Sequence, residues 1–435
     1  MDNVWMLTNY NDWEELVTKK MQEDGLWNKV IINREDFLEH EVLDILPREL
    51  YEQIYSFLPQ FMDMISRNSP ISQSTYAENN IHDYLNLFNL YINYYYTSFN
   101  KENISLFITN RAPHVGFDLI AYLVASVMNL RTIILEQSLF PNRFFIYGDH
   151  FDYGRFETSK EIIPHNYIAL EKKHEKNLFY MQNKKLALRF RLRNFYVENK
   201  YIRLLSELFH KANRSQAIYR FQLKKEFEKN KNALVTPISL EDKFIYFALH
   251  LQPEKTTSSW GGKYVDQVLA LEHLSEILPS DVKIYVKENP KQGYFMRGKY
   301  FYERIKRIKN VVLVPPDTNT YDLIKNSLFV STITGTVGWE AISGGKNVLV
   351  FGWGVWYKKL PGVFSFDQGV SFEEVVNYKI DFSVLEQKLN DLLSLTGKGV
   401  VYTKGPGYKS IVKDYTLENN IKNLCNSIKK YLYNG

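Results

Sequence analysis

Apolar and polar residues along the first third of the chain follow a strand, helix, strand order. The apolar run Ile104–Thr109 predicts a buried strand, and Phe117–Met128 has apolar residues at helical spacing. Arg131–Leu135 then predicts a second buried strand. This order is typical of a βαβ unit, whose two strands run parallel in one sheet. The pattern therefore predicts a parallel sheet in the N-terminal half.

A second unit of the same kind follows in the C-terminal half. Strand patterns at Ser327–Val330 and Val348–Phe351 enclose a helix pattern at Val337–Ile342. The turn that enters the helix contains Thr334, Gly335 and Thr336. Such a turn either offers backbone N–H groups to a phosphate or caps the helix without a ligand. The turn alone does not decide between these two interpretations.

The alternation of strand and helix extends through the rest of the C-terminal half. It predicts three further strands, at Phe244–Leu249, Lys283–Val286 and Val311–Val314. The predicted helices are Tyr264–Leu278, Phe301–Ile308 and Thr320–Lys325, and the TTSSWGG stretch is expected to be a loop. Together these elements indicate a second doubly wound domain. Residues 1 to about 100 are instead expected to be mostly helical, with one early strand at Lys29–Ile32 and a buried helix over Tyr84–Phe99.

These patterns divide the chain into three predicted parts. We expect an N-terminal domain at residues 1–232 and a C-terminal domain at 233–400, with a helical tail at 401–435 that packs back on the first domain. Residues 171–232 carry 17 Lys and Arg against 6 Asp and Glu, although the whole chain has a net charge of only +5. This basic segment is predicted to be helical and amphipathic, with apolar residues that include Leu186, Leu188, Phe190, Leu192, Phe195, Leu204, Leu205 and Leu208. It is either an attachment to an anionic membrane surface or a solvated face between domains.

Composition excludes several classes of protein. The chain of 435 residues contains one cysteine, Cys425, so an intrachain disulfide and a cysteine zinc site are both excluded. No signal peptide and no apolar run of membrane-spanning length is expected, which favours a cytoplasmic protein. The sequence lacks a GxxxxGK[ST] phosphate loop, a GxSxG elbow and an HExxH metal motif. No nucleic-acid-binding module accompanies the basic segment.

Candidate chemical groups follow the strands of the first unit. Arg111 and His114 come after its first strand, and Glu136 and Gln137 after its second. Ligands of parallel sheets bind at the carboxyl ends of strands, so all four are expected to face one cleft. His114 and Glu136 could transfer protons, or could be a helix-capping histidine and a carboxylate bonded to backbone N–H groups. Asp118 is most simply an acidic residue in a first helical turn.

The strands of the C-terminal half end on polar residues as well. His250, Gln252 and Glu254 follow the strand Phe244–Leu249. Lys287 and Glu288 follow the strand Lys283–Val286, and the ammonium group of Lys287 could meet a phosphate there.

These motifs together resemble one known family. The segments HLQPE, TTS, GG and VDQ, then KENP, TGTVGWEA, VLVFG and LPGV, are similar to stretches of the capsule polysaccharide biosynthesis family related to the Kdo transferases of bacterial capsule assembly. The upstream segments PHVGFD and LEQSLFPNRF resemble members of the same group. The resemblance implies an α/β, GT-B-like fold, in which two Rossmann-like domains with parallel sheets face a central cleft. The first hundred residues and the basic segment have no counterpart in it.

The resemblance also implies roles. The donor would be a CMP-activated acidic sugar, Kdo or a nonulosonic acid, bound mainly by the C-terminal domain with its phosphate on the turn Thr334–Thr336 and its ribose on Glu340. His250, Gln252, Glu254, Lys287 and Glu288 would complete the donor pocket, while Arg111, Gln137 and Arg143 would serve the acceptor side. Glu136 is the first candidate for the reacting carboxylate, with Asp118 and Glu254 behind it and His114 as a proton-transfer group. No cofactor and no metal are expected, because the donor has one phosphate and the sequence has no Asp-x-Asp element.

Alternatives remain open on the same fold. The chain could use a UDP-sugar donor, could be a nucleotide-sugar epimerase, or could bind glycans without catalysis. A transferase of this kind would need a glycan or glycolipid acceptor. It would work in the cytoplasm, at the inner face of the bacterial inner membrane if the basic segment binds lipid.

Overall fold

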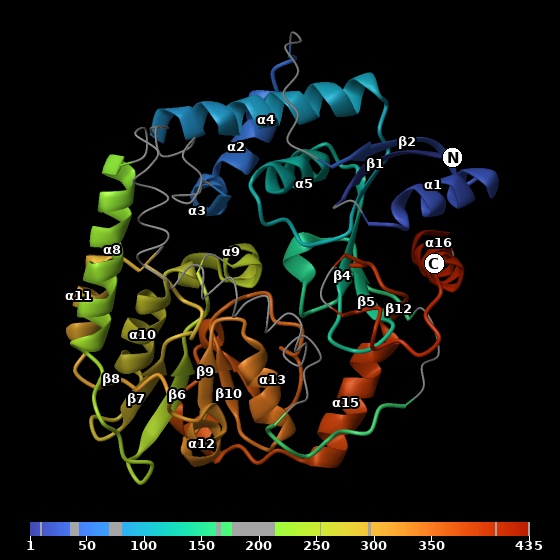
Figure 1. Cartoon of the computed structure of the whole chain (residues 1–435). Helices are drawn as coiled ribbons and strands as arrows, with labels where there is room; N and C mark the ends of the chain where they lie inside the picture. The colour runs from blue at the N-terminus through green and yellow to red at the C-terminus, as the bar shows by residue number, and fades with distance from the viewer. Residues whose placement is uncertain are drawn as a thin grey trace.

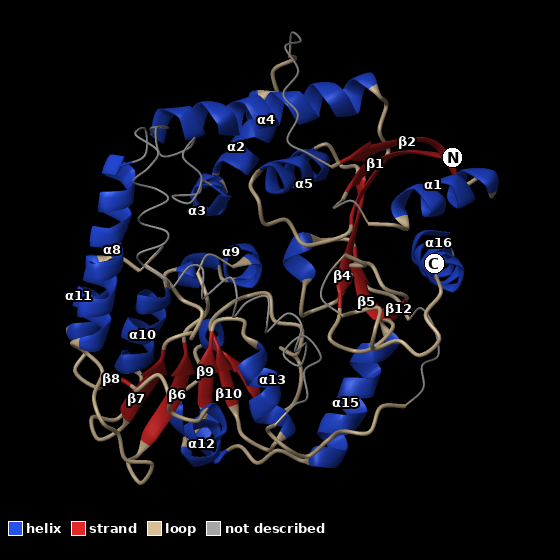
Figure 2. Cartoon of the chain, viewed as in Figure 1, coloured by secondary structure: helices blue, strands red, loops and turns tan. Residues whose placement is uncertain are grey.

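The computed structural model describes residues 1–8, 11–34, 43–68, 81–161, 167–175, 214–252, 254–294, 297–404 and 407–433. Two six-stranded sheets, each flanked by helices, form the two halves of the molecule (Figures 1 and 2). The chain therefore has the predicted α/β architecture with two Rossmann-like halves. Most of the basic segment, including all of its apolar residues named above, lies outside the described residues.

The first sheet has the strand order β12-β5-β4-β3-β1-β2. Its strands are β1 (Asp2–Leu7), β2 (Trp27–Asn33), β3 (Leu106–Thr109), β4 (Arg131–Gln137), β5 (Arg143–Tyr147) and β12 (Thr396–Lys398). The four strands β2, β1, β3 and β4 are parallel, as the βαβ pattern predicted. β5 and β12 are antiparallel additions at one edge. The order of the strands changes direction between β1 and β3, which is where the ligands of open sheets bind.

The expectation that the first hundred residues are mostly helical overlooked β1. Val4, Trp5, Met6 and Leu7 of this strand are all buried, so both of its faces are covered. A strand buried on both faces has no alternation of apolar and polar residues for a sequence pattern to detect. The predicted strand at Lys29–Ile32 is confirmed within β2.

Helices of the first half cover this sheet. They are α1 (Glu14–Glu23), α2 (Arg48–Tyr55), α3 (Leu58–Asn68), α4 (Ile81–Lys101) and α5 (Phe117–Val127). The predicted buried helix is confirmed as α4, the long helix along the top of Figure 1. Phe88, Tyr91, Tyr95 and Phe99 lie on its buried face, at a spacing that returns to one side of a helix.

The second sheet is parallel throughout, with the order β11-β10-β9-β6-β7-β8. Its strands are β6 (Phe244–Ala248), β7 (Lys283–Lys287), β8 (Val311–Leu313), β9 (Val330–Thr332), β10 (Val348–Val350) and β11 (Val363–Ser365). This is the Rossmann order, built from two halves that meet between β6 and β9. The residues after β6 and β9 therefore lie at the point where such sheets bind nucleotides.

The helices of the second half follow the expected alternation. They are α8 (Arg214–Asn232), α9 (Lys255–Trp260), α10 (Gln267–Glu276), α11 (Lys299–Lys306), α12 (Thr320–Asn326), α13 (Thr336–Ser343), α14 (Phe372–Asn377) and α15 (Phe382–Ser394). The loop prediction for TTSSWGG is wrong, because most of it forms α9. Its Thr and Ser residues are poor helix formers, but Thr257, Ser258, Ser259 and Trp260 are all buried. Tertiary packing thus stabilises a helix that local sequence does not favour.

The C-terminal part of the chain returns to the first half. After β12, helix α16 (Leu417–Tyr433) packs beside α1. Leu424, Cys425 and Ile428 of α16 belong to the same buried cluster as Val17 and Met21 of α1. Among the described helices, none is long and apolar enough to cross a membrane.

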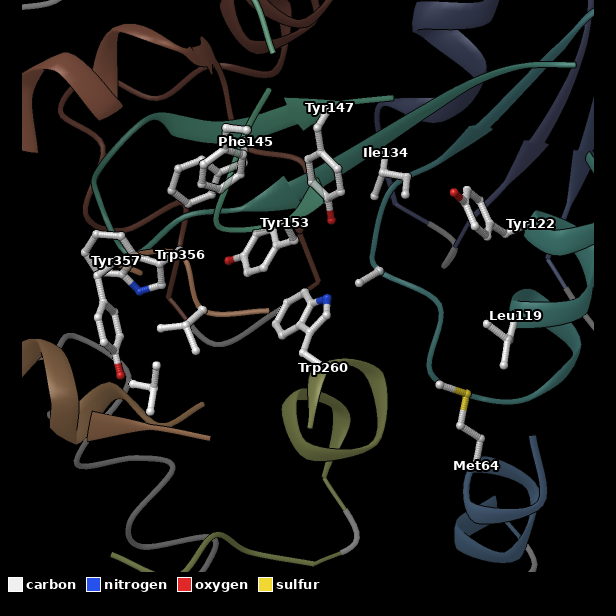
Figure 3. Packing of buried hydrophobic residues seen from close by; sticks show 14 of the residues in the cluster. Met64, Leu119, Tyr122, Ile134, Phe145, Tyr147, Tyr153, Trp260, Trp356 and Tyr357 are labelled. Atoms are coloured by element: carbon white, nitrogen blue, oxygen red, sulfur yellow. The ribbon is translucent and has the colours of Figure 1, made fainter. Parts of the chain in front are cut away.

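The two halves pack against each other through aromatic side chains. Trp260 of α9 stacks on Tyr153 of the first half, with ring centroids 4.2 Å apart and planes inclined by 7°. Figure 3 shows this pair beside Phe145 and Trp356. Phe145 comes from the first half and Trp356 from the second, so one continuous core joins the halves.

Candidate active site

A cavity of about 410 Å³ is lined by residues from the carboxyl ends of strands in both sheets. Six of the residues predicted from the sequence line it, namely Arg111, His114, Glu136, Gln137, Thr334 and Thr336. The expectation that the first four face one cleft is therefore met in the geometry. The cavity also has polar and aromatic walls that sequence reasoning missed, among them Lys255, Trp260, Trp356, Tyr402 and Tyr408.

The turn after β9 is held from within the protein. The backbone N–H of Thr334 donates to Nε2 of His250 at 3.2 Å, and that of Gly335 donates to Oγ1 of Thr332 at 3.2 Å. The hydroxyl of Tyr357 donates to the carbonyl oxygen of Gly335 at 2.5 Å. A Cβ atom on Gly335 would lie 2.8 Å from Oγ1 of Thr332, so any larger residue would have to displace Thr332. The turn is thus fixed in place, and helix α13 begins directly after it at Thr336.

His250 supports this turn and is itself buried. Its Nε2 also lies 2.9 Å from Oγ1 of Thr332. Because Nε2 accepts the N–H of Thr334, this nitrogen carries no proton. Burial, and secondarily the charge of Arg297, lowers the pKa of His250 to about 4. The ring is therefore neutral near pH 7, and it is absent from the cavity wall.

Asp118 lies beneath the loop between β3 and α5. Its two carboxylate oxygens accept the backbone N–H groups of His114 and Val115, each at 2.9 Å. Oδ2 is also 3.8 Å from Nε of Arg111. Burial alone would raise the pKa of Asp118, but His114 and Arg111 outweigh it and hold the pKa well below its ordinary value. Asp118 is fully buried and does not line the cavity, so it is placed to fix the loop.

His114 does line the cavity. Its Nδ1 lies 3.0 Å from the carbonyl oxygen of Ala112, and a carbonyl can only accept, so Nδ1 carries the proton of the neutral ring. Burial lowers the pKa of His114, although Asp118 acts in the opposite direction. A neutral ring with an unprotonated Nε2 could accept a proton from a ligand.

Glu136 and Lys255 form an ion pair across the cavity. Nζ of Lys255 is 2.7 Å from each carboxylate oxygen of Glu136. Glu136 stands near the end of β4 in the first half, and Lys255 begins α9 in the second. The carboxylate also accepts the N–H of Ala112 at 2.8 Å. Both interpretations of Glu136 therefore have a basis here, because a carboxylate with a backbone partner also faces the cavity.

Two other predicted donor residues surround a buried arginine. The guanidinium of Arg297 is fully buried and donates to Glu288 at 3.2 Å, to the carbonyl oxygen of His250 at 2.9 Å, and to the side chain of Gln252. Gln252 in turn donates to the carbonyl oxygen of Val265 at 2.7 Å. This network joins the loops after β6 and β7 next to the cavity residues, while Gln252 and Glu288 themselves lie outside the cavity lining.

The remaining predicted donor residues also lie outside the lining. Lys287 donates to the carbonyl oxygen of Thr318 at 2.5 Å and to Oγ1 of Thr320 at 3.0 Å. Glu254 is the residue before α9 and makes no side-chain capping bond. Glu340 is buried within α13.

Gln137 and Arg143, which were predicted to serve the acceptor, differ in position. Gln137 lines the cavity and its Oε1 accepts the N–H of Val401 at 2.9 Å. This bond fixes the returning chain, whose Tyr402 and Tyr408 form part of the wall. Arg143 is buried outside the cavity and donates to the carbonyl oxygen of Leu393 at 3.4 Å.

Lys255 was not predicted as a site residue, because the TTSSWGG segment that follows it was expected to be a loop. The available signal was its place directly after HLQPE, where a cation follows the end of a predicted strand. Tyr402 and Tyr408 gave no such signal, since their position depends on the return of the chain to the first half.

Two Rossmann-like halves with a shared cavity at the carboxyl ends of their strands define a GT-B-like protein. The model of one family, the capsule polysaccharide biosynthesis proteins, matches residues 161–394. The chain belongs to this family.

Among solved structures, a β-Kdo 2,7 transferase KpsC of Thermosulfurimonas dismutans is similar at 10% identity, over 98% of this chain and 99% of that one, with a TM-score of 0.35. A β-Kdo 2,4 transferase KpsC of the same organism has 14% identity over 70% and 85% of the two chains, with a TM-score of 0.33. A UDP-GlcNAc 2-epimerase of Methanocaldococcus jannaschii has 13% identity over 90% and 99%, with a TM-score of 0.26. No curated protein matches the chain.

Proposed function

We propose that this protein is a glycosyltransferase that moves an acidic sugar, Kdo or a nonulosonic acid, from a CMP-sugar to a bacterial surface glycan. The observation that carries the proposal is the shared cavity, which is lined by Glu136 of one half and by Thr334 and Thr336, at the turn after β9, of the other. Membership in a capsule polysaccharide family supports a role in glycan assembly. A transferase needs both a donor site and a reacting group, and this cavity offers candidates for each.

The donor would bind to the second half, at the point between β6 and β9. The N–H groups of Thr334 and Gly335 bond within the protein and hold the turn in shape. The phosphate would lie beside this turn, at the N-terminus of α13, where the helix dipole favours an anion. The hydroxyl of Thr334, which is buried and has no hydrogen-bond partner among the described residues, would be a further donor. His250 and Arg297 would act by holding the loops of this site in place.

The reaction would then proceed at the anomeric carbon. The bond from this carbon to the phosphate oxygen breaks, its electron pair leaves with CMP, and an oxocarbenium-like centre develops. A hydroxyl oxygen of the acceptor forms the new bond, and Glu136 takes its proton. Helix N–H groups would stabilise the charge on the leaving phosphate, so we infer a mechanism that needs neither metal nor cofactor.

Binding and turnover assays with separate donors test this proposal. The protein should bind CMP, and should slowly hydrolyse CMP-Kdo or a CMP-nonulosonate in the absence of acceptor, with the same rate in EDTA. Binding of UDP without binding of CMP would refute the CMP donor. Release of UDP together with a rearranged sugar, in the absence of acceptor, would identify an epimerase instead. If treatment with EDTA abolishes the activity and added Mg²⁺ restores it, the metal-free mechanism is refuted.

We further infer that the protein acts in the cytoplasm, at the inner face of the bacterial inner membrane. The acceptor of such an enzyme would be a glycan or glycolipid, and residues 171–232 have an excess of positive charge that would favour an anionic lipid surface. Nucleic acid is not an expected partner.

A further inference from the structure

The ion pair between Glu136 and Lys255 joins the two halves of the candidate active site. Both residues line the cavity, and Lys255 keeps a partly exposed side chain at 28% while that of Glu136 is 10% exposed. The candidate base is therefore bonded to a cation of the other half.

The geometry of this pair is that of an ammonium bound to a carboxylate. Nζ of Lys255 is equally distant, 2.7 Å, from both oxygens of Glu136. Nζ also lies 5.6 Å from the ring centroid of Trp260, the last residue of the same helix. This aromatic contact supports the ammonium independently of Glu136. Lys255 is thus held ready for a carboxylate in this part of the cavity.

Lys255 and the turn after β9 both belong to the second half. Their separation does not change if the two halves move relative to each other, so a donor phosphate near Thr336 would keep a fixed relation to Lys255. Among the described residues that line the cavity, the cations other than histidine are Lys255 and Arg111. Arg111 belongs to the first half and lies beside the fully buried Asp118.

We propose that Lys255 selects the acidic sugar of the donor by binding its carboxylate, and that Glu136 is the counter-ion that this carboxylate displaces. This inference rests on the proposed function. On displacement, Glu136 keeps its bond from the N–H of Ala112 and loses the ammonium. Its carboxylate then lines the cavity without the ammonium when the donor is in place. A neutral sugar has no carboxylate to exchange, so it leaves the ion pair closed.

Equilibrium binding of three probes tests this exchange. The probes are CMP, CMP-Kdo and CMP-N-acetylneuraminate, and the quantity measured is the ratio of CMP-sugar affinity to CMP affinity. Lys255→Met should lower this ratio about tenfold or more, because it removes a charge-assisted contact, and should leave CMP affinity unchanged. Glu136→Gln should raise the ratio several-fold, because it removes the competing carboxylate.

Two further variants serve as controls. Lys255→Arg keeps the charge and should retain most of the ratio. Lys263→Met removes an exposed lysine elsewhere in the second half and should change nothing. If Lys255→Met does not fold, the other two variants still test the exchange. The ratio should rise in Glu136→Gln and should stay close to that of the wild type in Lys255→Arg.

The outcomes separate this inference from the proposed function. A static link between the halves predicts that Lys255→Met changes the affinities for CMP and for both CMP-sugars by the same factor, and that result would overturn selection by Lys255. An unchanged ratio in Glu136→Gln would overturn the displacement. Failure of the wild-type protein to bind CMP or any CMP-sugar would overturn the proposed function and this inference together.

Discussion

Glu136 and Asp118 are carboxylates of the same half with different surroundings. Glu136 faces the cavity, whereas Asp118 is buried beneath the loop and accepts two backbone N–H groups. The first position suits proton transfer and the second suits support of the loop. Substitutions at the two positions should therefore affect different quantities.

Glu136→Gln should lower kcat about 10²- to 10⁴-fold, the range typical of a lost general base, while the melting temperature changes little. Asp118→Ala should lower the free energy of unfolding by about 3 kcal/mol, because it leaves Arg111 and two backbone N–H groups without their carboxylate. Initial rates and urea unfolding curves of the two variants measure these effects. A variant Asp118→Ala with unchanged stability and abolished turnover would contradict this division and return Asp118 to the list of catalytic candidates.

His250 gives the fold a dependence on pH. An unfolded histidine has a pKa near 6.5, and the folded pKa of His250 is about 4. Between these values the unfolded chain binds a proton that the folded protein does not, so stability falls as the pH drops from about 6.5 to about 4. From pH 7.5 to 5.0 this histidine alone should cost about 2 kcal/mol.

Urea unfolding at these two pH values tests the effect. His250→Gln offers an amide oxygen to the N–H of Thr334 and has no titrating group, so the loss of stability on acidification should become smaller by about 2 kcal/mol. His82→Gln, at an exposed position of α4, is the control and should keep the full loss. An identical pH dependence in wild type and His250→Gln would show that His250 is not buried as a neutral ring.

Helix α13 is the element that brings the turn to the cavity, and its packing tolerates no added atom at Gly338. A Cβ at this position would lie 2.2 Å from the hydroxyl oxygen of Tyr357, which bonds to the carbonyl oxygen of Gly335. Gly338→Ala should therefore displace Tyr357, lower the free energy of unfolding by about 2 kcal/mol and weaken CMP binding. Thermal unfolding and CMP titration measure both effects. Gly298→Ala, where a Cβ would meet open space, should leave both unchanged; equal behaviour of the two variants would contradict this packing argument.

The βαβ elements were predictable because their patterns are local. The strands and helices around Ile104–Leu135 and Ser327–Phe351 have continuous apolar runs or helical spacing, and the structure places β3, β4, β9 and β10 there within a few residues. Since parallel strands align their carboxyl ends, the sequence also predicted that Arg111, His114, Glu136 and Gln137 meet. The cavity that these residues share was thus partly predictable.

What the sequence did not reveal depends on contacts between distant elements. Helix α9 is stabilised by burial at the junction of the halves, and β12 reaches the first sheet only after the chain has completed the second. Lys255 is the first residue of α9, Tyr402 follows β12, and both line the cavity. His250 was instead predicted to contact the donor, because histidine at a strand end often binds a ligand. Its hydrogen bonds with Thr332 and Thr334 place it behind the turn, outside the cavity lining.

At the scale of the whole molecule, charge is distributed unevenly. Residues 171–232 carry 17 basic and 6 acidic residues, and the rest of the chain is net acidic. The described residues of this segment are 171–175 and those of α8, where Lys225 and Lys229 are exposed and Lys224 is half-buried. Tyr219 and Phe221 are exposed on the same helix, at 57% and 44%. Exposed aromatic and basic residues together are typical of surfaces that bind the headgroup region of membranes.

We therefore predict that the protein binds vesicles containing anionic lipid, and that it does so less as salt increases. Each lysine near an anionic surface contributes about 1 kcal/mol, so the variant Lys224→Glu, Lys225→Glu, Lys229→Glu should bind at least tenfold more weakly at low salt. A control variant, Lys19→Glu, Lys379→Glu, Lys413→Glu, makes the same change in net charge at exposed positions outside the basic segment. Cosedimentation with vesicles of phosphatidylglycerol and phosphatidylcholine, at 50 and 500 mM NaCl, measures the affinity. Equal weakening in both variants would mean that net charge alone drives attachment. An equal affinity for vesicles at the two salt concentrations would exclude an electrostatic contact. It would favour the interpretation of this segment as a solvated face between the halves.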